Sequence, residues 1–181
     1  MPNWCDNVII IKGEPEFLSR FKETLNGPDS QGEIVPFSFY HTVKNNENNQ
    51  PQTFDMRDIM SGKVDMYPNV KIWGVKWDAS DPEIVINDEN EVHVRCRTAW
   101  SPPIQWAKTV HKDWNIDITI HYAEEGTQNY GSYEINNKGV SDMKYKMNKD
   151  IEYNEESGEY DRKGDYKEFC DKWFDGIPKS G

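Results

Sequence analysis

Residues 92–122, VHVRCRTAWSPPIQWAKTVHKDWNIDITIHY, contain a strand, a helix and a second strand in direct succession. Apolar and polar residues alternate over 92–99, which predicts a strand with one packed face. The run Ser-Pro-Pro at 101–103 is a helix start, with a hydroxyl N-cap before prolines in the first turn. Apolar residues at helical spacing continue to Trp114, and alternation returns over 116–122.

A strand followed by a helix also occurs nearer the N-terminus. Residues 7–12 form a short β-branched run typical of a buried strand. Glu14-Pro15 opens a helix whose apolar residues recur at helical spacing as far as Leu25. We expect a second core strand at 70–77 and an additional short strand at 84–86. The order strand, helix, strand, strand, helix, strand predicts an α+β protein with a ferredoxin-like βαββαβ core.

A long insertion separates the first helix from the second strand. Residues 28–69 are irregular in pattern, and the polar tract at 44–52 has no core-forming residue, so we expect a loop there. One turn of helix is expected at 55–60.

The tail adds further elements behind the core. Residues 130–135 are expected to pair back on the strand before them as a hairpin. A small hairpin is expected around the Ser-Gly turn at 157–158, followed by a closing helix at 165–174. We predict a ferredoxin-like domain at 1–140 and a C-terminal extension at 141–181, packed on or beside it.

Composition narrows the classes of function. The formal net charge of −11 disfavours a protein that grips a nucleic-acid duplex, because phosphate binding needs clustered Lys and Arg. The third strand lacks the aromatic pattern of RNA-binding RRM domains, so we expect no direct nucleic-acid binding. Cys5, Cys96 and Cys170 are far apart and form no CxxC pair, which indicates free thiols in a reducing compartment. No signal peptide or membrane span is apparent, and we expect a cytoplasmic protein.

Three segments carry a resemblance to a known family. They are MPNWCDN at 1–7, WGVKWDA at 73–79 and TAWSPP at 98–103. Together they resemble the Api92-like (YubB-type) family, which is encoded by phages, plasmids and their relatives and is associated with a ferredoxin-like domain. The resemblance implies an accessory protein of a mobile element acting in a bacterial host cell. It implies no reaction and no catalytic residue.

Tryptophans in these segments are candidate ligand-binding residues. Such a cluster at the ends of core elements can stack on a base or another flat ligand. Neighbouring Lys and Arg side chains can hold the phosphate of that ligand by charge-assisted hydrogen bonds. Packing of the indoles in a core poor in Leu and Val is the competing interpretation. The predicted ligand-binding set is Trp4, Trp73, Lys76, Trp77, Arg95, Arg97 and Trp100.

A row of basic residues on one strand also has two interpretations. His93, Arg95 and Arg97 alternate with apolar residues and face one way. They either bind an anion or pair with the acidic residues of 78–91 across a hairpin. That acidic segment lacks the spacing of an EF-hand loop, so we expect no metal site.

Motifs of common enzymes are absent from the sequence. It contains no HExxH, Walker A, GxSxG or GxGxxG pattern, so we expect no cofactor and name no catalytic residue. Our hypothesis is a non-enzymatic binding protein that counters a host defence by holding a small anionic or nucleotide-derived ligand. Two alternatives remain. One is an acidic inhibitor that mimics nucleic acid toward a basic host protein. The other is a nucleotide-processing or hydrolytic enzyme, which requires His93 or His121 near a carboxylate in a deep pocket.

Overall fold

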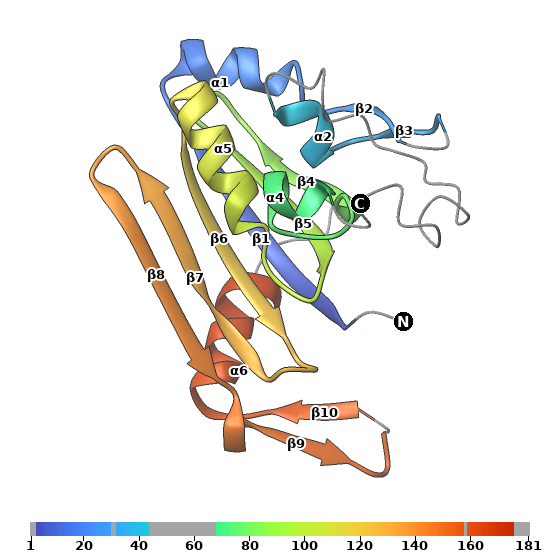
Figure 1. Ribbon diagram of the computed structural model, residues 1–181. Helices are drawn as coiled ribbons and strands as arrows, with labels where there is room; N and C mark the ends of the chain where they lie inside the picture. The colour runs from blue at the N-terminus through green and yellow to red at the C-terminus, as the bar shows by residue number, and fades with distance from the viewer. Residues whose placement is uncertain (1–2, 30–31, 44–67, 158, 176–181) are drawn as a thin grey trace.

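The computed structural model describes residues 3–29, 32–43, 68–157 and 159–175. Its centre is a six-stranded antiparallel sheet with the strand order β4-β5-β1-β6-β7-β8 (Figure 1). The strands are β1 Trp4–Lys12, β4 Ser80–Asn87, β5 Glu91–Ala99, β6 Asp117–Glu124, β7 Asn129–Asn136 and β8 Gly139–Lys146.

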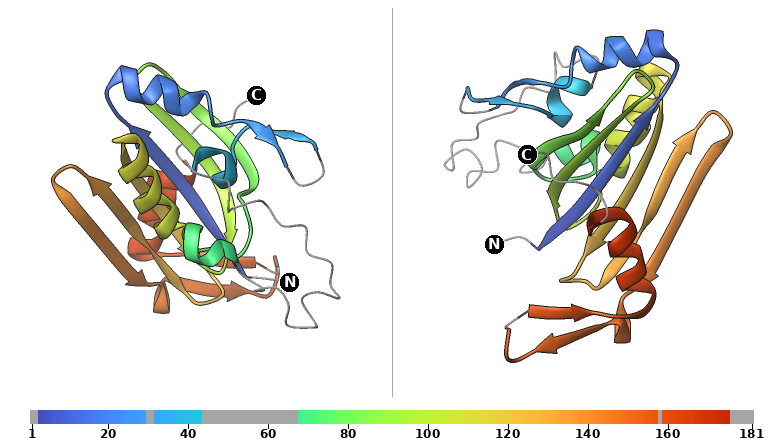
Figure 2. Two further views of the ribbon diagram at one scale, coloured as in Figure 1. Left: turned by 45° about the horizontal axis from the view of Figure 1, so that its top comes forward. Right: turned by 180° about the vertical axis from the view of Figure 1, so that it is seen from behind.

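Two helices cover one face of this sheet. They are α1 Pro15–Lys22 and α5 Ile104–Trp114, and both lie on the same side of the sheet (Figures 1 and 2). The order β1-α1-β4-β5-α5-β6, with β1 between β5 and β6, is the ferredoxin-like arrangement. The predicted βαββαβ core is therefore confirmed. Asn115 ends α5 in the left-handed conformation, with its N–H bonded to the carbonyl of His111.

The second strand of this core was predicted at the wrong place. Residues 70–77 do not form a strand, because helix α4 occupies Pro68–Trp73 and a turn follows it. Gly74, at φ +80°, ends this helix in the left-handed region, and its N–H donates to the carbonyl of Val70 at 2.9 Å. The second core strand is instead β4, which includes the short strand expected at 84–86.

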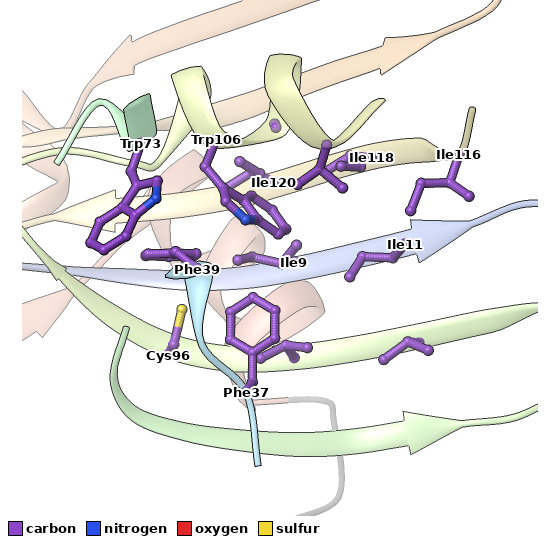
Figure 3. Packing of buried hydrophobic residues seen from close by; sticks show 14 of the residues in the cluster. Ile9, Ile11, Phe37, Phe39, Trp73, Cys96, Trp106, Ile116, Ile118 and Ile120 are labelled. Carbon is purple, nitrogen blue, oxygen red and sulfur yellow. The ribbon is translucent and has the colours of Figure 1, made fainter. Parts of the chain in front are cut away.

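Large aromatic side chains fill the layer between the helices and the sheet. Trp73 and Trp106 are fully buried there with Phe37 and Phe39, over the isoleucines of β1 and β6 (Figure 3). The Trp106 ring lies 5.6 Å from Phe37 and 5.2 Å from Phe39, centroid to centroid. A few bulky rings thus replace many smaller apolar side chains.

The insertion contributes directly to this core. It begins within β2 Gly27–Pro28, which pairs with β3 Ile34–Val35, and it contains the short helix α2 Phe39–Thr42. The hydroxyl and carbonyl oxygens of Thr42 accept hydrogen bonds from the indoles of Trp106 (2.9 Å) and Trp114 (2.8 Å). The loop expected at 44–52 and the helical turn expected at 55–60 lie outside the described residues.

A half-buried carboxylate fixes the start of α2. Asp78 accepts hydrogen bonds from the Ser38 hydroxyl and the Phe39 N–H, both at 2.6 Å, and from the Ala79 N–H at 2.7 Å. Burial raises the pKa of Asp78, and these hydrogen bonds oppose that effect. One side chain therefore ties the insertion to the start of β4.

The tail forms a third layer on the opposite face of the sheet. After β8 come the 3-10 turn Asn148–Asp150, strands β9 Ile151–Asn154 and β10 Glu159–Arg162, helix α6 Gly164–Cys170 and the π-helical turn Asp171–Asp175. Helix α6 lies against the face away from α1 and α5 (Figure 2). Its residues Tyr166 and Cys170 are buried with Ala123, Tyr130 and Met147 in a second apolar cluster.

Most of the secondary-structure elements that the sequence predicted for the tail are present in the structure. The β6–β7 hairpin, the β9–β10 hairpin and the closing helix are confirmed. Strand β8 was missed. The boundary predicted at residue 140 falls inside β8, and the division into two domains stays a prediction. No helix among the described residues is long and apolar enough to cross a membrane.

We expect Asp78→Ala to lower the free energy of unfolding by about 3 kcal/mol, because three donors, those of the buried Ser38 and Phe39 among them, lose their acceptor. Urea denaturation followed by tryptophan fluorescence measures this. The control Glu89→Ala, at an exposed position, is expected to change stability by less than about 0.5 kcal/mol. Equal stability of the two variants would contradict the role given to Asp78.

A histidine stack holds the end of the tail against the sheet. The rings of His121 and Trp173 are parallel to within 14°, with centroids 3.5 Å apart. The Nδ1 atom of His121 lies 2.7 Å from the Ser132 hydroxyl. Burial, helped by the charge of Lys172, lowers the pKa of His121 from 6.5 to about 4.

This lowered pKa predicts a loss of stability in acid. A histidine whose pKa is depressed by folding stabilises the native state fully above its unfolded pKa of 6.5, and that contribution disappears as the pH falls to about 4. We expect a loss of about 2 kcal/mol over this range, after allowance for partial solvation of the ring. Urea denaturation at stepped pH values measures it. His121→Gln should lack this component of the pH dependence, and an unchanged profile in that variant would refute the assignment.

Candidate functional site

The three motif segments meet at one end of the sheet. Strand register places Trp4 opposite Ala99, so the first residues of β1 lie beside the chain that leaves β5. The N–H of Trp100 donates to the carbonyl of Asn3 at 2.9 Å. The turn between α4 and β4 brings Trp77 to the same place.

Three tryptophans, Trp4, Trp77 and Trp100, form a surface row that we call the indole row. The ring of Trp77 lies 6.2 Å from that of Trp4 and 5.9 Å from that of Trp100, centroid to centroid. Trp77 and Trp100 remain 41% and 47% exposed. The Lys76 ammonium is 4.9 Å from the Trp77 ring centroid and 5.4 Å from that of Trp100. The row therefore combines open aromatic surface with a positive charge.

The backbone of Trp100 has a strained conformation. Its φ of +66° lies in the left-handed region, where a bulky residue is an outlier. This conformation costs about 1–2 kcal/mol relative to an ordinary backbone. Bonds on either side hold it in place: the Ser101 N–H donates to the Ala99 carbonyl (3.0 Å), and the Thr98 hydroxyl donates to the Ser101 carbonyl (2.7 Å). Backbone strain that is maintained in this way, at a residue whose side chain is exposed, marks a candidate functional position.

A cavity of about 400 Å³, which we call the rim cavity, opens beside Trp100. It lies between the start of α5 and strands β6, β7 and β8. Its lining includes Gly74, Trp100, Tyr122, Glu124, Asn129, Asp142 and Lys144. Burial raises the pKa of Tyr122 to about 12, so its hydroxyl keeps its proton at neutral pH.

Two residues of this lining, Glu124 and Asn129, carry buried oxygens that accept no hydrogen bond from the described part of the chain. Glu124 is 2% exposed, and its Oε2 atom accepts from the Thr127 N–H at 2.8 Å. The Asn129 amide donates to the Thr127 carbonyl at 3.0 Å. Among the described residues no donor reaches the Glu124 Oε1 or the Asn129 Oδ1. Buried polar atoms are usually paired, so these two oxygens favour a guest that donates hydrogen bonds.

The predicted set does not assemble as one group. Trp4, Lys76, Trp77 and Trp100 come together in the indole row. Trp73 instead lies in the core at 1% exposure, with its ring 6.0 Å from Phe39 (Figure 3). Its indole follows α4 into the core because this segment is helical.

The two arginines lie on the face that α6 covers. The Arg97 guanidinium pairs with Asp81 and lies 5.2 Å from the Trp4 ring centroid, so it contacts only the end of the indole row. Arg95 donates from Nη2 to the Phe174 carbonyl at 2.7 Å. Both line a separate cavity of about 480 Å³ under α6. The pairing of Arg97 is the one across the β4–β5 hairpin that the sequence offered as the alternative.

The histidines considered for catalysis do not lie in the rim cavity. His93 has its Nε2 atom 3.3 Å from the Glu91 carboxylate, and His121 contacts Ser132 and Trp173. Neither lines the rim cavity or the cavity under α6. In the described part of the chain, no three His, Cys, Asp or Glu side chains are grouped to hold a metal ion.

These features define a ferredoxin-like α+β protein with a candidate binding site at one end of its sheet. A family model described as the ferredoxin-like domain in Api92-like protein matches residues 72–163, and the chain belongs to this family. The match runs from α4 to the end of β10 and confirms the resemblance carried by the motifs. No curated protein and no solved structure matches the chain.

The strain at Trp100 predicts an unusual order of stability between two variants. Trp100→Gly relieves the left-handed strain, whereas Trp100→Ala keeps it, and both remove the ring. We expect Trp100→Gly to be more stable than Trp100→Ala by about 1 kcal/mol in thermal or urea denaturation. The same pair at Lys108, an exposed residue inside α5, should give the opposite order. Trp100→Ala as the more stable variant would contradict the strain.

Proposed function

We propose that the protein binds a small planar ligand that carries a negative charge, such as a nucleotide derivative, at the indole row and the rim cavity. The observation that carries this proposal is the pair of exposed indoles, Trp77 and Trp100, with the ammonium of Lys76 over both rings. Large aromatic side chains gathered on a surface are characteristic of recognition sites.

The chemistry of the row fits a nucleobase with an attached phosphate. Stacking of one base on an aromatic side chain is worth about 1–3 kcal/mol. The flexible stem of Lys76 allows its ammonium to follow an anion above the rings. The Lys76 ammonium lies over both exposed rings, whereas the Arg97 guanidinium lies over Trp4 at the far end of the row, so Lys76 is the principal cation in this proposal.

The rim cavity adds a preference for donor groups. Trp100 lines the cavity, so a ligand stacked on this indole lies at its entrance. Glu124 and Asn129 line it, and in the described part of the chain no donor reaches Glu124 Oε1 or Asn129 Oδ1. A ring edge bearing N–H groups, as in an aminopurine, would satisfy them, whereas a ring with acceptors alone would not.

In a phage or plasmid protein, such binding would act by sequestration. Holding a nucleotide-derived signal out of solution would counter a host defence that depends on it. This role rests on the family and on the proposed ligand class. It requires no catalytic residue.

The two alternatives from the sequence have less support. An acidic inhibitor of a basic protein needs free carboxylates, yet Asp81 pairs with Arg97 and Glu91 with Lys12. Asp88 accepts the N–H groups of Asn90 and Glu91 within the β4–β5 turn. The enzyme alternative required His93 or His121 near a carboxylate in a deep pocket, and neither histidine lines the rim cavity.

Calorimetric titration of the full chain with a panel of purine and pyrimidine nucleotides tests the proposal. We expect heat with a purine nucleotide and at least tenfold weaker binding for Trp77→Ala and for Trp100→Ala, because each removes a stacking ring. Lys76→Met should weaken binding and flatten its dependence on salt.

Tyr153→Ala is the matched control, since Tyr153 is also an exposed aromatic residue but lies on β9. It should bind as the unmodified chain does. No heat with any nucleotide, or full affinity in Trp100→Ala, would refute the proposed function.

A further inference from the structure

The two outer strands of the sheet differ in how their edges are protected. Strand β4 contains Pro82 and has two register shifts against β5, between Ser80 and Glu83 and between Ile84 and Ile86. Proline and bulges are the usual devices that stop an edge strand from pairing with another chain. Strand β8 has neither. It pairs with β7 in an unbroken register from Gly139 to Lys146.

The side chains of β8 are open to solvent on both faces. All eight residues are exposed, and three of them are large and apolar: Val140, Met143 and Tyr145. In the described part of the chain no strand pairs with the outer edge of β8, which forms the margin of the sheet (Figure 1). A long, regular and partly apolar edge of this kind is a template for a further strand.

We propose that β8 pairs in antiparallel fashion with β8 of a second copy of this chain, about a two-fold axis at Met143. In this register Asp142 of each copy lies directly opposite Lys144 of the other. Directly opposed residues point to the same face of a sheet, so the two charges form an ion pair, and symmetry makes a second one.

The charge pattern selects this register over its neighbours. Moving the axis by one residue in one direction places Asp142 opposite Asp142. Moving it in the other direction places Lys144 opposite Lys144. Like charges directly opposed across a ladder are destabilising, so only the register centred on Met143 pairs opposite charges at both positions.

Pairing of the two edges also completes the wall of the rim cavity. Asp142 and Lys144 line that cavity, on the face of the sheet that α5 covers. In the paired sheet, Lys144 of the second copy lies beside Asp142 at the cavity wall. The two rim cavities of the pair therefore lie on one side of a continuous sheet, next to the two-fold axis. This proposal does not depend on the identity of any ligand.

Analytical ultracentrifugation of the full chain over a range of protein concentrations tests the pairing by charge exchange. We expect a dimer that weakens at least tenfold with Asp142→Lys and with Lys144→Asp. The double variant carrying both changes should recover the dimer, because opposite charges again face each other. Glu168→Lys, an exposed charge reversal on α6, should leave the dimer unchanged. A monomer at every concentration, or a dimer insensitive to the single reversals, would overturn the proposal.

Cross-linking tests the register itself. In Met143→Cys, two new thiols face each other across the axis, and mild oxidation should give a covalent dimer. In Ser141→Cys, the same register separates the thiols by about 13 Å along the strands, so no cross-link should form. The native Cys5, Cys96 and Cys170 are buried and should not compete. Efficient cross-linking of the Ser141→Cys variant, or none in the Met143→Cys variant, would overturn the register.

Discussion

The structure depends on the pairing of the central strand β1 with β5 on one side and β6 on the other. The run from Val8 to Ile11 is buried on both faces, so this strand tolerates no change of register. A slip of one residue would turn each side chain to the opposite face. The same register carries Asn3 to Trp100 and sets Cys5 opposite Glu124, so the order of the core strands also builds the candidate site.

Elements whose sequence has a clear period could be predicted. Strand β5 and helix α5 each have one packed side whose period is visible in the sequence, and the sequence of β6 alternates in the same way. Strand β1 could be predicted as a short β-branched run of the kind that is buried on both faces. Residues 70–77 were wrongly predicted as a strand because Trp73, Val75 and Trp77 alternate with other residues. The left-handed conformation of Gly74 rules out a strand there. Strand β8 was missed because neither of its faces is buried, so its sequence has no apolar period.

The residues of the candidate site could likewise be predicted only in part from the sequence. The indole row lies at the ends of core elements, and residues near such ends could be grouped from the sequence alone. Trp73 was wrongly assigned to the site because the segment 70–77 was predicted as a strand. Arg95 was wrongly grouped with the indoles because it lies under α6, and the sequence does not show where this helix packs. Glu124 and Asn129 were missed because the lack of a donor near a buried oxygen is a property of the folded chain.

Several features at this end of the sheet are unfavourable for the stability of the native state, as is common at binding sites. The strain at Trp100, the exposed rings of the indole row and two acceptors that have no donor among the described residues each raise the free energy of the native state. A ligand that stacks on the row and donates to Glu124 and Asn129 would offset the last two costs, and it would stabilise the fold by mass action. The buried strand β1 and the hydrogen bonds accepted by Asp78 stabilise the rest of the fold. This stability keeps the unfavourable features in place when no ligand is bound. Trp100 directly follows β5, which pairs with β1 from Trp4 to Lys12, so the central pairing of the sheet holds the strained residue in place.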